Sequence, residues 1–293
     1  MISVVVPALN EAGAIGQTVE DIHAALTSAG IEAFEVIVVD DGSSDGTGDI
    51  AETHGARVIR HPRNIGYGRS LKHGIAAAAH DTIVISDADG TYPVHEIPAL
   101  LAEYRRGLDL VVGARVNTDI HDKGYKRIMR RSLRGLIELI AGRHVPDVNS
   151  GLRVFSRAMA MRYFPTLCDT FSFTTSQTLA FMLNGLFVEF YPLHYQPRTG
   201  SSKVRLFRDS VRTLQYVLQT VLYYQPIRIF ILFTGVLIVT AVISFTAAWL
   251  THLTLAYLLG VGCLLMAIVV FCLGLIADLL RQIMHQRFGN GDG

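Results

Sequence analysis

The chain of 293 residues is poor in cysteine and almost without net charge, and each shortage excludes a class of protein. Three scattered cysteines, Cys168, Cys263 and Cys272, do not suggest the disulfide framework of a small secreted domain, so we expect reduced thiols. A formal net charge of +1 provides no bulk attraction to nucleic acid, and we expect no nucleic-acid partner. The first residues, MISVVVPALNE, lack the basic stretch of a secretory signal peptide.

The sequence also lacks histidines at the spacing of metal ligands. Those of the N-terminal part stand apart along the chain, and we interpret them as surface or core residues: His54, His61, His73, His80 and His95. No internal repeat or low-complexity segment is visible. A histidine-based metal centre is therefore not expected.

Long apolar runs, in contrast, are abundant near the C-terminus. Hydrophobic residues make up 50% of the chain, and the excess gathers after Pro226. IRIFILFTGVLIVTAVISFTAAWL carries one charge, Arg228, and after the polar break THLT the run LAYLLGVGCLLMAIVVFCLGLIA carries none. Each run exceeds the roughly 20 residues that cross a bilayer as a helix, whereas a buried core helix of this length would contain polar residues. We predict two membrane spans within residues 227–280.

The flanking charges predict the orientation of this hairpin. Basic residues precede the first span and follow the second, while the connecting loop carries only His252: Lys203, Arg205, Arg208, Arg212 and Arg228 before, Arg281 and Arg287 after. By the positive-inside rule both termini and the bulk of the chain are cytoplasmic. Residues 201–226 have amphipathic spacing and predict a helix in the membrane interface. Residues 281–293 are expected to be a disordered cytosolic tail.

The N-terminal part alternates short apolar runs with helical patterns. The predicted strands cover residues 2–8, 34–42, 56–62, 81–90 and 108–115, and helices are predicted between them. This βα alternation predicts an α/β domain over residues 1–200, with a mostly parallel, Rossmann-like sheet and helices on both faces. Ligands of such sheets bind at the carboxyl ends of the strands.

Two aspartates follow the fourth predicted strand in the motif ISDADG. Asp87 and Asp89 stand two residues apart, so in an extended chain their carboxylates face the same way, with Ala88 turned aside. A divalent cation with oxygen ligands, Mg²⁺ or Mn²⁺, would relieve the repulsion between them. The alternative is an ordinary turn, in which aspartate and glycine are common.

Two further polar loops end predicted strands. VVDDGSSDG places Asp40 and Asp41 after the second strand, and PALNE, from Pro7 to Glu11, follows the first. The second loop alone could be a helix-capping cluster, because serine and aspartate suit N-caps. Three acidic or amide-rich loops at the strand ends of one sheet together indicate a ligand site.

Four motifs in this order resemble the inverting glycosyltransferases of family 2, which have the GT-A fold: VVVPALNE, VIVVDDGSSDGT, RNIGYGRSLKHGI and ISDADGTYP. DVNSGLRVF, QPRTGSSKVR and the C-terminal hairpin narrow the resemblance to the polyprenyl-phosphate glycosyltransferases, the group of dolichol-phosphate mannose synthase and bactoprenol glucosyltransferase. The resemblance covers nearly the whole chain. It implies a GT-A domain followed by a transmembrane hairpin of two helices.

The resemblance also implies roles for individual residues. Those expected to bind the nucleotide sugar are Pro7, Ala8, Asn10 and Glu11 at the nucleoside, Asp40 and Asp41 at the base and ribose, and Asp87, Ala88 and Asp89 at the diphosphate. Asp87 and Asp89 would hold the metal, Mg²⁺ or Mn²⁺. The candidates for gripping a lipid phosphate are Arg115, Arg127, Arg131, Lys203 and Arg205. The family places a serine in the region of KGYKRIMRRS, where this chain has Arg130 or Arg131 and Ser132 close by.

The implied reaction moves a hexose from a nucleotide sugar to undecaprenyl or dolichyl phosphate at the bilayer. UDP-glucose is favoured as donor and GDP-mannose comes next. Asp147 could orient the acceptor, act as a base or pair with Arg153. SFTTSQ carries no acid where relatives with alcohol acceptors often have one, which favours a phosphate acceptor.

Alternatives remain open at this level. One is a family 2 transferase with a lipid or glycan hydroxyl acceptor and Asp147 as base. Another is a catalytically silent membrane scaffold. A processive synthase is disfavoured, since the chain has no QxxRW pattern. Whether copies of the chain form a homo-oligomer is undetermined.

Overall fold

The computed structural model describes residues 1–115, 134–135, 137–194 and 206–289, with the backbone alone for residues 206–213 and 284–289. The chain forms two compact units, Met1–Val217 and Leu218–Gly293. The first unit contains the predicted α/β domain. It runs past residue 200, at which the sequence analysis places the end of that domain.

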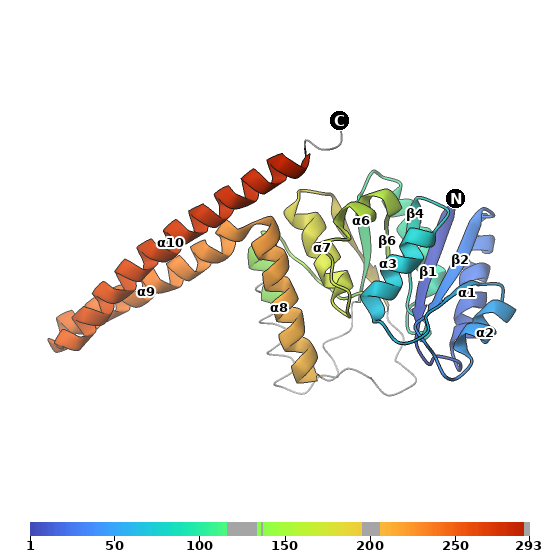
Figure 1. The fold of residues 1–293 in the computed structure, drawn as a ribbon, viewed down its shortest axis with the longest axis horizontal. Coiled ribbons are helices and arrows are strands. Elements are labelled where there is room, and N and C mark those ends of the chain that lie inside the picture. The colour runs from blue at the N-terminus through green and yellow to red at the C-terminus, as the bar shows by residue number, and fades with distance from the viewer. Residues whose placement is uncertain (116–133, 136, 195–205, 290–293) are drawn as a thin grey trace. The chain divides into compact units, whose positions relative to one another are not determined.

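A seven-stranded sheet forms the centre of the first unit (Figure 1), with strand order β3-β2-β1-β4-β6-β5-β7. The strands are β1 Ile2–Ala8, β2 Phe34–Asp40, β3 Arg57–Arg60, β4 Thr82–Ile85, β5 Leu110–Arg115, β6 Arg153–Ser156 and β7 Val188–Leu193. The sheet is mostly parallel, as predicted, and only β6 runs antiparallel to its neighbours β4 and β5. Sequence analysis did not predict β6 or β7. Strand β6 is only four residues long, and β7 contains Pro192, a residue typical of edge strands.

Helices cover both faces of this sheet. They are α1 Ile15–Ser28, α2 Thr47–Thr53, α3 Tyr67–Ala77, α4 Ile97–Tyr104, α6 Arg157–Tyr163 and α7 Phe173–Leu183, with a 3₁₀ turn η1 at Val94–Glu96. Helices α1, α2 and α4 lie on one face, and α3, α6 and α7 lie on the other (Figure 1). The α/β architecture expected from the βα alternation is confirmed.

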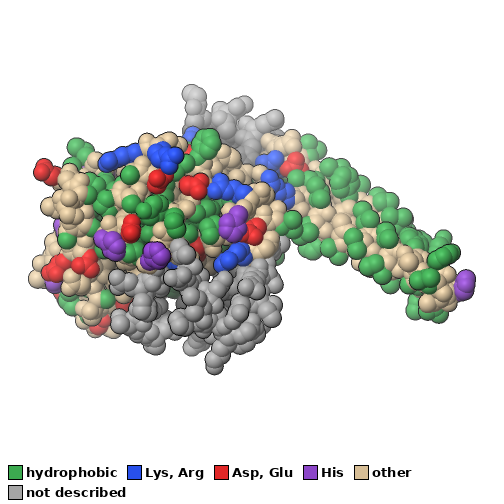
Figure 2. Space-filling view, turned by 180° about the vertical axis from the view of Figure 1, so that it is seen from behind, with side chains coloured by type: hydrophobic (Ala, Val, Ile, Leu, Met, Phe, Trp, Pro, Cys, Tyr) green, Lys and Arg blue, Asp and Glu red, His purple; other side chains and the backbone are tan. Residues whose placement is uncertain are grey.

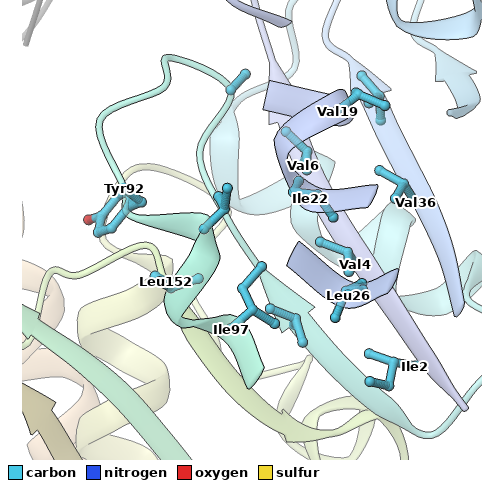
Figure 3. Close-up of a cluster of buried hydrophobic side chains, with 14 of the residues drawn as sticks. Ile2, Val4, Val6, Val19, Ile22, Leu26, Val36, Tyr92, Ile97 and Leu152 are labelled. Atoms are coloured by element: carbon cyan, nitrogen blue, oxygen red, sulfur yellow. The ribbon is translucent and has the colours of Figure 1, made fainter. Parts of the chain in front are cut away.

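The core explains why β1 is apolar at every position except Ser3. Its side chains alternate between the two faces of the sheet, and both faces are covered. Val4 and Val6 pack with Ile22 of α1 and Ile97 of α4 in one buried cluster (Figure 3). On the other face α3 packs so close to the sheet that a side chain at position 74 would overlap Val5, and glycine at this position avoids the overlap. The close packing on both sides fixes the strand ends that carry the polar loops.

Three helices form at the C-terminal end of the chain: α8 Leu206–Tyr224, α9 Pro226–Thr251 and α10 Thr254–Gly289. Helix α8 occupies most of the predicted amphipathic segment. Pro226–Thr251 and Thr254–Ile283 are long and apolar enough to cross a membrane, and most of their side chains are not buried inside the protein. Apolar side chains cover the visible face of this hairpin (Figure 2).

The predicted boundaries of the hairpin need one correction. The polar break is confirmed, because α9 ends at Thr251 and His252 adopts φ 54° in the left-handed region. The expected disorder of residues 281–293 is wrong for 281–289, where α10 continues to Gly289. Ile283 continues the apolar pattern past residue 280, the expected end of the span, and the helix does not end there. Residues 290–293 lie outside the described residues.

Candidate active site

The ends of strands β1, β2 and β4 meet at one edge of the sheet. Ala8 pairs with Asp40 in the parallel ladder of β1 and β2, and Val5 pairs with Ile85 in the ladder of β1 and β4. Pro7 and Ala8 are buried at the end of β1. The three polar loops therefore start side by side, as the sequence analysis expects for the carboxyl ends of neighbouring parallel strands.

Hydrogen bonds fasten the first loop to the second. The N–H of Asn10 donates to Ser43 Oγ at 2.9 Å, and the side-chain oxygen of Asn10 accepts from the N–H of Ser44 at 2.9 Å. The N–H of Glu11 donates to Thr47 Oγ1 at 2.9 Å. Asn10 has φ 51°, a left-handed conformation that asparagine tolerates better than most residues. The two loops thus form one wall, and the contacts of Asn10 and Glu11 with a nucleoside remain a prediction.

The side chain of Asp41 forms hydrogen bonds with the loop that leads into α3. Its carboxylate accepts from the N–H groups of Ile65 and Gly66, both at 2.9 Å, and lies 2.9 Å from Nδ1 of His61. His61 Nε2 lies 3.0 Å from Nδ1 of His73. His61 is a buried partner of the site's second loop, which agrees with its interpretation as structural. These contacts order the loop, and a contact of Asp41 with a base or ribose remains a prediction.

Asp40 and Ala88 line the same edge. Asp40 is 7% exposed, and its Oδ1 accepts from the N–H of Ser43 at 2.9 Å. The carbonyl of Ala88 accepts from the hydroxyl of Thr18 at 3.2 Å, which ties the third loop to α1. Both residues are held firmly, and their contacts with a nucleotide remain predictions.

Asp87 and Asp89 lie directly after β4, on either side of buried Ala88. Burial, and after it the charge of Asp89, raise the pKa of Asp87 from 3.8 to about 6. Asp89 Oδ1 accepts from the N–H of Thr91 at 3.2 Å and from its hydroxyl at 2.5 Å. The charge of Asp89 thus acts on Asp87, and the convergence of the two carboxylates on one cation remains a prediction.

Asp87 is enclosed by a tyrosine and a glycine. Tyr67 Oη donates to Asp87 Oδ1 at 2.9 Å, and burial, followed by the charge of Asp87, raises the pKa of Tyr67 so that it keeps its proton. A Cβ at Gly151 would lie 2.7 Å from Asp87 Oδ1, so only glycine allows this approach. The N–H of Gly151 donates to Tyr92 Oη at 2.7 Å. The ring of Tyr67 stacks on Phe171, which is 68% exposed, with a centroid distance of 5.2 Å.

Arg115 and Asp147 form an ion pair beside this cluster. Arg115 ends β5, and its Nε and Nη2 donate to the two oxygens of Asp147 at 2.6 and 3.0 Å. Burial alone would raise the pKa of Asp147, but hydrogen bonds from Arg115 and the charge of Arg115 outweigh it and lower the pKa. The expected alternative, an Asp147–Arg153 pair, is wrong. Arg153 donates instead to backbone carbonyls and to neutral side chains.

The acidic pair fits a divalent cation that shares its ligands with a substrate. Among the described residues no group of three or more histidine, cysteine, aspartate or glutamate side chains could hold a metal. Asp87 and Asp89 therefore offer two carboxylates at most. Mg²⁺ and Mn²⁺ commonly bind one or two carboxylates plus substrate phosphates, so the residues present fit such an ion.

Several expected site residues cannot be placed, and others were not expected. The candidate phosphate ligands Arg127, Arg131, Lys203 and Arg205 lie outside the described residues. Sequence analysis did not single out Tyr67, Tyr92 or Gly151, and it named Arg153 only as a possible partner of Asp147. Gly151 and Arg153 lie in the quoted motif DVNSGLRVF, where an arginine in an otherwise apolar strand was the available signal.

Comparison with known proteins identifies the family of this chain. The model of the family described as Glycosyl transferase family 2 matches residues 3–164. The low-salt glycan biosynthesis hexosyltransferase Agl6 of Haloferax volcanii is 32% identical over 222 residues, which is 74% of this chain and 53% of Agl6. The undecaprenyl-phosphate 4-deoxy-4-formamido-L-arabinose transferase of Edwardsiella ictaluri is 28% identical over 250 residues, covering 80% of this chain and 72% of that protein. The chain thus spans about half the length of Agl6.

Solved structures show the same fold. Glucosyl-3-phosphoglycerate synthase of Mycobacterium tuberculosis, crystallised with Mn²⁺, UDP-glucose and phosphoglyceric acid, superposes with a TM-score of 0.62 at 23% identity. The match covers 75% of this chain and 79% of that chain, and at this identity it supports the GT-A fold alone. With the family match over more than half of its residues, the chain belongs to family 2 of the glycosyltransferases.

Proposed function

We propose that this glycosyltransferase is anchored in a membrane and moves a hexose from a nucleotide sugar to a polyprenyl phosphate, with inversion at the anomeric carbon. UDP-glucose is the favoured donor and GDP-mannose the next. The acceptor is undecaprenyl or dolichyl phosphate. Relatives named as undecaprenyl-phosphate transferases, which match 80% or more of this chain, support the choice of acceptor.

The ion pair of Arg115 and Asp147 carries this proposal. Asp147 is 9% exposed in its side chain and held ionised by two hydrogen bonds from Arg115. A carboxylate with a lowered pKa is a poor base for an alcohol. A phosphate monoester has a second pKa of about 6 and is largely dianionic at neutral pH, so it attacks without a base. The pair therefore suits a phosphate acceptor better than a hydroxyl.

Different residues of the site bind the donor and the acceptor in this proposal. The wall formed by Asn10, Glu11 and the loop after β2 receives the nucleoside. Asp87 and Asp89 would hold Mg²⁺ or Mn²⁺, which when bound offsets the negative charge of the diphosphate. Arg115 presents its guanidinium to the acceptor phosphate, and Asp147 fixes its orientation. Guanidinium groups bind phosphate through two hydrogen bonds, which suits this task.

The hairpin is proposed as the membrane anchor. The candidate spans Pro226–Thr251 and Thr254–Ile283 expose mostly apolar side chains, which a bilayer would cover. The basic residues that flank them favour a cytoplasmic position for both termini and the catalytic domain. A long-chain prenyl acceptor is itself a membrane lipid, so anchoring brings the enzyme to it.

The alternative acceptor, a lipid or glycan hydroxyl, requires Asp147 to act as a base. This alternative needs Asp147 to leave Arg115 or to gain a higher pKa when substrates bind. A silent scaffold is not supported, because the family match is to glycosyltransferases and the acidic pair after β4 is intact.

A transfer assay tests the proposal. The purified full-length protein is incubated with Mn²⁺, undecaprenyl or dolichyl phosphate and radiolabelled UDP-glucose or GDP-mannose, and label in the organic phase is counted. We expect label from one donor, lost in Asp89→Ala and kept in Asp21→Ala, a matched change of an exposed aspartate on α1. Protein that binds nucleotide but labels no lipid from either donor would overturn the polyprenyl-phosphate acceptor.

A further inference from the structure

Arg153 is a fully buried cation in the middle of the catalytic unit. It begins β6, is 0% exposed and lies opposite Ile85 of β4, two residues before Asp87. Burial lowers its pKa to about 10, so it remains protonated at neutral pH. A buried charge is costly unless anions or hydrogen bonds compensate for it. Its partners therefore indicate why the chain retains it.

Among the described residues, neutral groups accept all the hydrogen bonds of Arg153. Nε donates to the carbonyl of Ser150 at 3.1 Å, and Nη1 donates to the carbonyl of Thr174 at 3.0 Å. Nη1 also donates to Gln177 Oε1 at 3.0 Å and to Thr178 Oγ1 at 3.2 Å. In the part of the chain that the structure describes, no carboxylate lies within ion-pair distance of this guanidinium. The side chain joins α7 to the loop before β6 but keeps its charge.

This charge lies close to the acidic end of β4. The carbonyl of Ser150, which accepts from Arg153, lies one residue before Gly151. Gly151 packs against the carboxylate of Asp87. The charges of Arg153 and Asp87 influence each other's pKa. Arg153 thus provides a fixed positive charge behind the carboxylates proposed to hold the metal.

A diphosphate would use such a charge. Two carboxylates and one divalent cation sum to no net charge, and the donor then adds the negative charge of its diphosphate. That charge grows as the glycosidic bond breaks and the nucleoside diphosphate leaves. A preorganised cation in a buried site stabilises the developing charge without reorganisation.

We propose that Arg153 is a positioning residue that serves the donor's diphosphate in two ways: it holds the loop before β6 against Asp87, and its unneutralised charge favours binding of the diphosphate. This inference rests on the proposed donor class. Arg153 acts through the loop and through its field, and does not touch the reacting atoms.

Gln177 makes the charge testable without breaking the hydrogen bonds. It is 0% exposed, its Oε1 accepts from Arg153, and its buried Nε2 has no hydrogen-bond partner among the described residues. Gln177→Glu keeps the shape and the accepting oxygen and loses no hydrogen bond. It places a carboxylate against the guanidinium and so neutralises its charge. Gln177→Met is the matched control, because it removes the accepting oxygen and adds no charge.

The readout is the affinity of the full-length protein, with Mn²⁺, for a nucleoside, its monophosphate and its diphosphate. Uridine and guanosine series are titrated in parallel by calorimetry. We expect Gln177→Glu to lower the affinity for the diphosphate about tenfold. The affinity for the monophosphate should fall less, and that for the nucleoside should not change. Gln177→Met should change all three affinities by the same factor. Arg153→Lys, which keeps the charge, should retain the preference for the diphosphate better than Arg153→Met.

The outcomes separate this inference from the proposed function. Wild-type diphosphate affinity in Gln177→Glu, or an equal loss for all three ligands, would overturn the charge role of Arg153 while the transferase assignment stands. A wild-type protein that binds neither nucleotide series with Mn²⁺ would overturn the proposed donor class and this inference with it.

Discussion

The guanidinium of Arg115 donates to both carboxylate oxygens of Asp147, from Nε at 2.6 Å and from Nη2 at 3.0 Å. The N–H of Asn149 also donates to Asp147 Oδ1 at 3.0 Å. Arg115, which sequence analysis names as a candidate phosphate ligand, and Asp147, whose role it leaves open, therefore form one unit. The pairing makes Arg115 rigid and leaves Asp147 weakly basic, and both effects favour a phosphate acceptor.

Replacing Asp147 by asparagine distinguishes orientation from base catalysis. Asp147→Asn keeps one oxygen that can accept from Arg115, so we expect kcat/KM to fall about tenfold, mainly through KM for the acceptor. Steady-state kinetics with varied polyprenyl phosphate measure this. A fall of kcat by about 100-fold to 10,000-fold, with loss of one limb of the pH profile, would identify Asp147 as a base.

The raised pKa of Asp87 predicts a pH-dependent stability of the metal-free protein. Below the ordinary value of 3.8 both folded and unfolded chains hold the proton, whereas between 3.8 and about 6 only the folded chain keeps it. The free energy of unfolding therefore falls as pH rises through this window, by no more than about 3 kcal/mol. Asp87→Asn should remove the penalty and be more stable than wild type at pH 7.5, with little difference near pH 4. Denaturation of metal-free protein in detergent at both pH values measures this, with Asp21→Asn as control. An equal gain at both values contradicts the titration of Asp87.

Gly151 is predicted to be intolerant of a side chain for a local reason. A Cβ there would lie 2.7 to 2.9 Å from the carboxylate atoms of Asp87 and would push that group out of place. We expect Gly151→Ala to lower transfer activity about 100-fold and to weaken Mn²⁺ binding. Gly135→Ala, where no atom of the described residues lies within 4 Å of the added Cβ, is the matched control. Unchanged Mn²⁺ affinity in Gly151→Ala would show that Asp87 relaxes without loss of the site.

Gly74 is predicted to matter for stability rather than for catalysis. A Cβ at this position of α3 would overlap Cγ1 of Val5 and lie 2.9 Å from Cγ2 of Val39. Overpacking of this kind costs about 1–3 kcal/mol, so Gly74→Ala should lower the thermal midpoint of the catalytic unit. Differential scanning fluorimetry of the purified protein checks this, again beside Gly135→Ala. A midpoint equal to that of wild type would mean that α3 can shift away from the sheet.

Much of the fold could be predicted from local sequence patterns. Runs such as SVVVPA and VIVV mark buried parallel strands, and the spacing of Ile15, Val19, Ile22 and Leu26 gives α1 one apolar face. The apolar runs after Pro226 predict two long helices because a span is contiguous in sequence. ISDADG placed Asp87 and Asp89 at a strand end, since the signal lies within a few residues.

Tertiary structure decided what depends on residues distant in the chain. Sequence left the partner of Asp147 open, and the packing of β5 beside the loop before β6 selected Arg115 across 32 positions. The sequence could not show that Gly151 and Tyr67 enclose Asp87. Nor could it show that Arg153 is buried with no ion pair to a carboxylate among the described residues. The physical reason is that side-chain pairing and burial arise from contacts between elements, whereas strand and helix signals arise from the period of the chain itself.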